Sequence, residues 1–101
     1  MVERVVAGIV NADGSRRSGD DFTVSRASEG HYLVSFRPAF TNVSGGSATQ
    51  IYDGNTLDNA VIIRLNNSEL YVKTGDSNGN ARDRPFTFVS AGEGSHTSKK
   101  D

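Results

Sequence analysis

Oxygen-bearing side chains recur at alternate positions in one polar segment of the chain. Asp76, Asn78 and Asn80 have the spacing of the first three ligands of an EF-hand calcium loop. That loop also needs Gly at its sixth position and Glu at its twelfth, where this chain has Ala81 and Thr87. We therefore predict a hydrophilic loop without a metal. Asp76, Asn78 and Asn80 remain candidate residues for contact with a ligand or a partner.

Two tyrosines and an isoleucine are the other candidates for contact with a partner. Tyr52 and Tyr71 are the first choices for stacking against a ligand, because each ring offers a broad apolar face. Ile62 is expected opposite Tyr71, on the side of a hairpin that faces away from the core. A monomer does not need an apolar pair there, so we expect a covering loop or a neighbouring subunit to bury it. A ligand is the third alternative.

We expect no catalytic group in this chain. His31 lies at a hairpin corner and His96 near the C-terminus, and neither has a Ser or Asp neighbour that would complete a nucleophile–base pair. The carboxylates that occur in pairs lie beside turn-forming residues, and these pairs are Asp20 with Asp21 and Asp53 with Asp58. Cysteine is absent, which excludes thiolate chemistry and disulfides. We predict a non-enzymatic protein that uses no cofactor.

Length and charge restrict the classes of partner. The 101 residues suffice for one domain, which we place at residues 1–91, followed by a disordered tail at 92–101. The chain has 11 basic and 12 acidic residues, whereas a nucleic-acid binder normally gathers a basic excess on one face, so we predict no nucleic-acid partner. No apolar run is long enough to cross a bilayer, and the N-terminus does not resemble a signal peptide. We expect no membrane insertion.

The elements that must position these groups are β-strands. No segment repeats apolar residues with the helical period over three turns. The expected strands cover residues 2–10, the arms of a hairpin at 21–37, residues 49–52, the arms of a second hairpin at 59–74, and residues 86–90. Residues 16–20 and 39–47 are expected to be connections. This pattern predicts an all-β fold, an antiparallel β-sandwich or a jelly-roll-like barrel of six or seven short strands.

The first hairpin has a register that the sequence itself predicts. A three-residue loop at 28–30, with Gly30 in the left-handed conformation, would pair Ala27 with His31. Counting outward from this loop puts the large apolar residues of both strands on one face, with Val24 opposite Val34 and Phe22 opposite Phe36. A loop one residue shorter would divide these residues between the two faces, which a half-buried sheet does not tolerate.

The second hairpin is predicted from a two-residue turn at Asn66-Asn67. This turn would set Arg64 opposite Glu69 as an ion pair and Ile62 opposite Tyr71. The core side would then carry Val61, Ile63, Leu70 and Val72.

Four segments together resemble a known kind of module. They are Val6 to Gly14, Phe22 to Val24, Gly30 to Phe36 and Phe86 to Gly92. These segments resemble small β-sandwich modules of bacterial proteins and of the receptor-end regions of phage tail fibres, and they are more distantly similar to the H-type lectin sandwich. The resemblance implies a homo-oligomer, with a trimer as one form, and some such modules bind glycans. The chain has no Trp, and we carry over no lectin residues.

The expected function is therefore binding or structural. We expect a non-enzymatic, oligomeric β-sandwich module of the phage tail-fibre or bacterial surface-recognition type, with a glycan or a surface protein as its partner. We expect a soluble protein, and the sequence itself does not indicate a compartment. The resemblance is compatible with a location on a virion or an extracellular surface. A carbohydrate-binding lectin is the first alternative, and an unrecognised small enzyme is the second.

Overall fold

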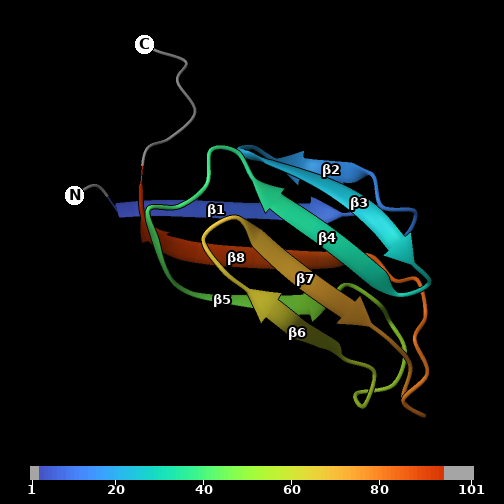
Figure 1. Ribbon diagram of the computed structural model, residues 1–101. Coiled ribbons are helices and arrows are strands. Elements are labelled where there is room, and N and C mark those ends of the chain that lie inside the picture. Colours follow the sequence, from blue (N-terminus) through green and yellow to red (C-terminus); the bar gives the residue numbers. More distant parts are fainter. Residues whose placement is uncertain (1–2, 95–101) are drawn as a thin grey trace.

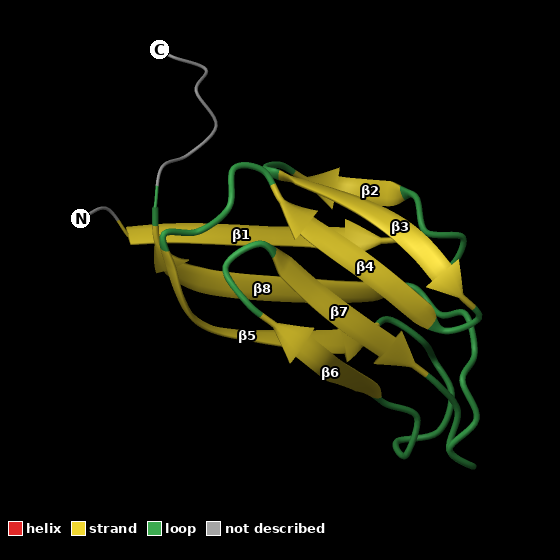
Figure 2. Ribbon diagram, viewed as in Figure 1, coloured by secondary structure: helices red, strands yellow, loops and turns green. Residues whose placement is uncertain are grey.

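The computed structural model describes residues 3–94 as eight β-strands in two stacked sheets (Figure 1). The strands are β1 (Glu3–Val10), β2 (Arg16–Gly19), β3 (Phe22–Ser28), β4 (His31–Phe36), β5 (Asn42–Gln50), β6 (Ala60–Leu65), β7 (Glu69–Thr74) and β8 (Phe86–Glu93). Within residues 3–94 there is no helix (Figure 2), and hence none that could cross a membrane. The prediction of an all-β antiparallel sandwich is confirmed, with eight strands in place of six or seven.

The two sheets combine strands from distant parts of the chain. One sheet has the order β2-β1-β8-β5 and the other the order β3-β4-β7-β6, and all neighbouring strands are antiparallel. The first and last strands, β1 and β8, therefore pair along their whole length in the middle of one sheet. Strand β6 is an outer strand of the other sheet, a position that matters for the site described below.

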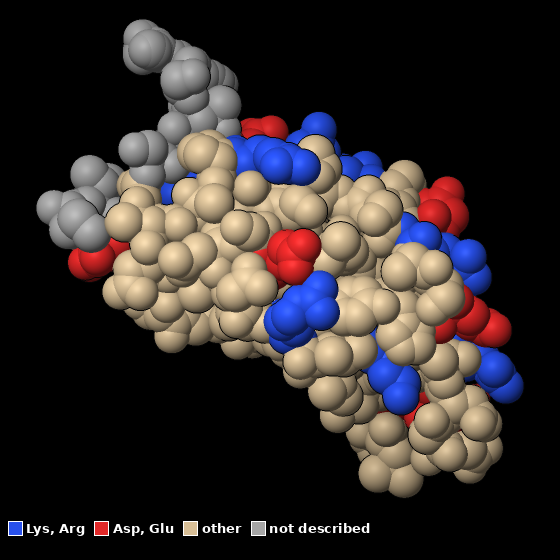
Figure 3. Space-filling model, viewed as in Figure 1, with Lys and Arg blue, Asp and Glu red and all other residues tan. Residues whose placement is uncertain are grey.

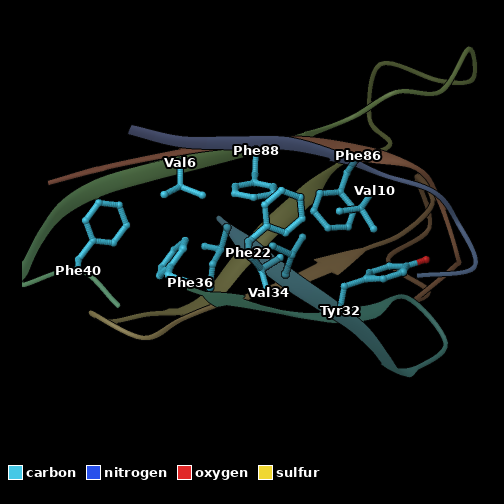
Figure 4. Close-up of a cluster of buried hydrophobic side chains, with 11 residues drawn as sticks. Val6, Val10, Phe22, Tyr32, Val34, Phe36, Phe40, Phe86 and Phe88 are labelled. Atoms are coloured by element: carbon cyan, nitrogen blue, oxygen red, sulfur yellow. The ribbon is translucent and has the colours of Figure 1, made fainter. Parts of the chain in front are cut away.

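The core lies between the sheets and is rich in aromatic rings (Figure 4). Its buried residues are Val6, Val10, Phe22, Tyr32, Val34, Phe36, Phe40, Leu70, Val72, Phe86 and Phe88. Phe22 and Phe88 meet edge to face, with ring centroids 5.0 Å apart. A Cβ at Gly8 would lie 2.5 Å from the Phe22 ring, so glycine in β1 allows the close approach of that ring. The alternating burial of β1, β4, β7 and β8 follows from the period-two pattern.

The register predicted for the first hairpin is confirmed over most of its length. Phe22 pairs with Phe36, and Val24 pairs with Val34. Gly30 has a positive φ of 71°, as the predicted loop requires. The closing pair was predicted wrongly. His31 pairs with Ser28, and Ala27, the predicted partner of His31, is the extra residue of a bulge between Arg26 and Ser28.

Two segments expected to be connections belong to strands. Residues 16–19 form β2, which pairs with β1, and residues 42–50 form β5, which pairs with β8. β5 contains few apolar residues, so its sequence alone does not predict a strand. β5 is a strand because its main chain forms antiparallel hydrogen bonds with β8. The short strand expected at 49–52 is the end of β5, which stops at Gln50.

The register predicted for the second hairpin is wrong. The main-chain amide of Asn66 donates to the carbonyl of Glu69, and the Asn66 side chain accepts from the amides of Ser68 and Glu69. These bonds move the turn by one residue, to 67–68. A bulge then inserts Ile63 between the pairs Ile62–Val72 and Arg64–Tyr71.

The shifted register changes which residues face outward. Leu70 and Val72 are buried as predicted, but Val61 and Ile63 are exposed. Ile62, predicted to face away from the core, packs against the buried cluster. A change of one residue in pairing moves a side chain to the opposite face of a sheet, which accounts for these errors.

The final strand extends beyond its predicted end. β8 includes Gly92 and Glu93, which we had placed in a disordered tail. Glu93 pairs with Glu3 of β1 and with Asn42 of β5. Gly94, also in the predicted tail, follows β8, and residues 95–101 lie outside the described residues.

Candidate functional site

Three strands place a row of side chains across the outer face of the second sheet. Lys73 of β7 pairs with Val61 of β6 on one side and with His31 of β4 on the other. Residues directly opposite in neighbouring strands point to the same face, so these three side chains form one row. The next outward-facing row contains Tyr71, paired with Leu33 of β4 and Arg64 of β6.

The first row lies in a groove of about 530 Å³, which we call the outer groove. Its apolar wall is formed by Leu57, Val61 and Ile63, and its polar wall includes Lys73, Asp76 and Asn80. The loops that follow β5 and β7 project from the same end of the sandwich and flank this region (Figure 1). The volume falls within the range of about 300–1,000 Å³ typical of ligand sites.

The apolar wall is unusually exposed. Leu57 has 69% of its surface accessible, Val61 51% and Ile63 48%. The bulge in β6 explains two of these values, because it turns Ile63 outward on the same side as Val61. Leu57 has no such explanation in the strand pattern, since it lies in the loop between β5 and β6. Three neighbouring aliphatic side chains thus border a concave surface and remain in contact with water.

Asp76 uses its carboxylate to hold the loop that forms the polar wall. Its Oδ1 atom accepts hydrogen bonds from the amides of Asn78 (3.0 Å) and Asn80 (2.9 Å). The Arg82 Nε atom lies 3.5 Å from its Oδ2 atom. The Asn80 amide contributes most to lowering the pKa of Asp76 below its ordinary value of 3.8. Asp76 and Asn80 reach the groove, whereas Asn78 contributes its main-chain amide to the turn.

The loop oxygens do not gather as metal ligands. Among residues 3–94, no group of three or more His, Asp or Glu side chains is close enough together to hold a metal ion. The alternate spacing of Asp76, Asn78 and Asn80 instead produces a compact turn, in which Gly79 has a positive φ of 86°.

Lys73 is the cation of the outer groove. Within residues 3–94 its ammonium group forms no ion pair, whereas the nearby Asp76 is paired with Arg82. His31 Nδ1 lies 2.8 Å from the carbonyl oxygen of Glu29. A carbonyl only accepts, so Nδ1 carries the proton of this bond and Nε2 is left for another partner.

Tyr71 lies beside the groove and is held between two neighbours. The Arg64 guanidinium is 5.1 Å from the centre of its ring, and the His31 ring centre is 6.0 Å away. Arg64 also forms the predicted ion pair with Glu69, at 3.0 Å, although the two residues are not directly opposite. Tyr71 and Ile62, expected side by side, lie on opposite faces of the sheet.

Tyr52 lies outside the outer groove. It follows β5, is half exposed, and stacks on the Arg84 guanidinium, whose carbon is 3.9 Å from the ring centre. This contact uses one face of the ring that we had expected to meet a ligand.

Of the residues that line the groove, sequence reasoning named Asp76 and Asn80 but missed Leu57, Val61, Ile63 and Lys73. Leu57 carried a usable signal, because it is the one large apolar residue in the polar stretch 53–59. The exposure of Val61 and Ile63 would have required recognition of the Asn66 turn. The place of Lys73 in the groove could not be predicted from the residues next to it in the sequence, because the strands β4 and β6 on either side of it create that place.

Asp83 anchors the far end of the loop that follows β7. Its carboxylate accepts from Arg26 Nε (2.9 Å), from the Gly30 amide (2.7 Å) and from the Tyr32 hydroxyl (3.3 Å). The hydrogen bond from Arg26 contributes most to lowering the pKa of Asp83 below 3.8. Burial raises the pKa of Tyr32 to about 12. These bonds tie the loop to the first hairpin and so help to position the polar wall.

This anchor predicts a loss of stability in acid. A carboxyl whose pKa is lower in the folded chain contributes stability above its ordinary value of 3.8, and the contribution disappears as the pH falls through the folded value. We expect the free energy of unfolding to fall between about pH 5 and pH 2, and less steeply for Asp83→Asn. Urea unfolding followed by circular dichroism at several pH values measures this. Equal slopes for the two proteins would contradict the prediction.

Charged side chains of both signs are mixed on one face of the described surface (Figure 3). On the face drawn in Figure 3, basic and acidic side chains lie next to one another and do not form separate regions. Comparison with known proteins adds nothing to this description, because no family model, no curated protein and no solved structure matches the chain.

Proposed function

We propose that this chain is a non-enzymatic recognition module that binds a partner through the outer groove and works as a homo-oligomer, as modules of phage tail fibres or bacterial surfaces do. The observation that carries the proposal is the exposure of Leu57, Val61 and Ile63 beside the groove. Isolated apolar side chains are normal on a protein surface. Apolar side chains gathered around a concave surface with a few polar groups are typical of a binding site.

The surroundings of His31 support binding in preference to catalysis. Its ring nitrogen bonds to a main-chain carbonyl and not to a hydroxyl that it could activate. Among the described residues that line the groove, Asp76 contributes the one carboxylate, and this carboxylate is engaged by main-chain amides of its own loop. A general base needs to reach the proton that it removes, and Asp76 is already committed to structure.

A second exposed apolar surface supports self-association. Val5 and Val89 are both exposed on the outer face of the first sheet, in the neighbouring strands β1 and β8. Ala7 pairs with Val89, and Val5 pairs with Ala91, so four apolar residues adjoin there. We assign the contact between copies to this surface, and the contact with a different partner to the outer groove.

Light scattering after size-exclusion chromatography tests the oligomer. At high micromolar concentration we expect a mass of at least two chains, that is, an integer multiple of the 10.8 kDa of one chain. The double variant Val5→Glu/Val89→Glu is expected to be a monomer, because it puts like charges into a self-complementary contact. The matched control Val61→Glu/Ile63→Glu changes two exposed β-branched side chains of the other sheet and should keep the parent's mass. A parent mass of 10.8 kDa would remove self-association from the proposal.

A lectin is the second candidate, because amide and carboxylate groups of Asn59, Asp76 and Asn80 line one wall of the groove. Such groups commonly hydrogen-bond to sugar hydroxyls. A glycan array with the parent and with Asn80→Ala distinguishes this candidate. Binding that the variant loses would favour the lectin, and an empty array would remove it.

A further inference from the structure

We propose that the outer groove binds an extended peptide segment that presents aliphatic side chains and a carboxylate on the same face, and that Lys73 pairs with this carboxylate. This inference rests on the proposed function and names the chemistry of the partner. It follows from three features of the groove, which are its aliphatic wall, its unpaired cation and its position at an outer strand.

The apolar wall suits aliphatic side chains. Leu57, Val61 and Ile63 present branched alkyl groups, and among residues 3–94 the imidazole of His31 is the one ring that lines the groove. Sugar rings are normally bound against flat aromatic faces, and the nearest tyrosine, Tyr71, already has Arg64 over its ring. A peptide side chain such as valine or isoleucine would bury apolar surface against this wall without needing a ring.

The charge of the groove favours a carboxylate. Asp76 is balanced by Arg82 and by two main-chain amides, so its charge is largely satisfied by its own loop. Lys73 has no such partner among residues 3–94 and lies in the middle of the row, between Val61 and His31. A cation flanked by apolar surface interacts more strongly with an anion than a fully solvated cation does. The outer groove is therefore complementary to a negative group next to an aliphatic one.

The position of the groove favours an extended segment. Val61 belongs to β6, which has a strand on one side only within its sheet. An extended peptide can lie along such a strand and alternate its side chains between two faces. Every second side chain of such a segment points to the same face, so an aliphatic side chain and a carboxylate two residues apart would both face the row that contains Val61 and Lys73. The residue between them would point to the other face. The bulge at Ile63 limits regular pairing to the first part of β6.

Nuclear magnetic resonance titration of the full chain with short synthetic peptides tests this inference. One peptide carries valine and glutamate two residues apart with threonine between them, so that both face the groove, and two matched peptides carry glutamine or lysine in place of glutamate. We expect the glutamate peptide to shift the amide resonances of residues 57–63 and 73–80, and to bind at least about threefold more tightly than the glutamine peptide. Lys73→Glu should weaken its binding by roughly tenfold and should allow the lysine peptide to bind.

Arg17→Glu provides the matched control. Arg17 is an exposed cation on β2, in the other sheet, and its reversal should leave all three affinities unchanged. Equal binding of the glutamate and lysine peptides to the parent would overturn the inference, and so would an unchanged preference in Lys73→Glu. Loss of the parent's oligomeric mass in Lys73→Glu would also overturn it, because the occupant would then be a second copy of the chain.

The same titration separates the two proposals. If the glutamine peptide or a glycan shifts the groove resonances while the glutamate peptide does not, the recognition module stands and the acidic peptide is rejected. If no probe shifts residues 57–63 or 73–80, both proposals fail.

Discussion

Phe88→Ala is expected to lower the free energy of unfolding by about 3–5 kcal/mol, the cost of removing a buried aromatic ring and leaving a cavity. Phe88 is fully buried at the centre of the core, on β8, which pairs with β1 and β5 (Figure 4). Its ring meets Phe22 edge to face, and Phe22 in turn covers Gly8. Both sheets therefore lose packing when this ring is removed.

The cavity left by Phe88 would collapse poorly. The surrounding side chains come from paired strands whose main-chain hydrogen bonds resist movement. A domain of this size has a total stability of about 5–15 kcal/mol, so the variant should be close to unfolding at room temperature. Urea unfolding at neutral pH, followed by circular dichroism, measures the change. Phe88→Leu is the matched control and should lose clearly less than Phe88→Ala, because it leaves a smaller cavity. Equal losses in the two variants would contradict the cavity argument.

Asp21→Asn is expected to lower the free energy of unfolding by about 3 kcal/mol, because it leaves a buried guanidinium without its counterion. Arg4 has 1% of its surface exposed, and its Nη2 atom lies 3.7 Å from Asp21 Oδ2. Its Nη1 atom donates to the carbonyl of Pro38 at 2.7 Å, and its guanidinium lies over the ring of Phe40. Nε and Nη2 are buried and form no hydrogen bond, so the charge of Asp21 is their main compensation.

The choice of asparagine separates charge from backbone geometry. Asp21 has a positive φ of 72°, which Asn adopts more readily than most residues do. The double variant Arg4→Met/Asp21→Asn removes the buried charge as well and should recover at least half of the loss, since an apolar side chain of similar size needs no counterion. Urea unfolding of the parent, the single variant and the double variant measures the three free energies of unfolding. A double variant less stable than Asp21→Asn would show that Arg4 stabilises the fold by other contacts.

The first hairpin shows how much the sequence predicted. Val24 and Val34, and Phe22 and Phe36, were matched correctly because one register alone puts all four on the same face. Phe86 and Phe88 are buried in the same alternating pattern. Where apolar residues alternate with polar ones, the local pattern contains the information about which side faces the core.

The second hairpin shows where this reasoning failed. Its strand β6 contains three consecutive β-branched residues, Val61, Ile62 and Ile63, so alternation could not decide which of them faces the core. Asn67 helps to hold the turn of this hairpin against the start of β5. Its side chain accepts a hydrogen bond from the amide of Val43 and donates one to the carbonyl of Thr41. These contacts join segments more than 20 residues apart.

By itself, the sequence determined the all-β class, most of the aromatic core, the first hairpin and the polar nature of the loop around Asp76. Only the tertiary structure decided that residues 42–50 form a strand, that Val61 and Ile63 face outward, and that Lys73 lies between Val61 and His31. The physical reason is that alternation acts within one strand, whereas pairing partners and a one-residue bulge depend on hydrogen bonds to distant segments. The outer groove is a product of that pairing, and for this reason the candidate site appeared only in the folded chain.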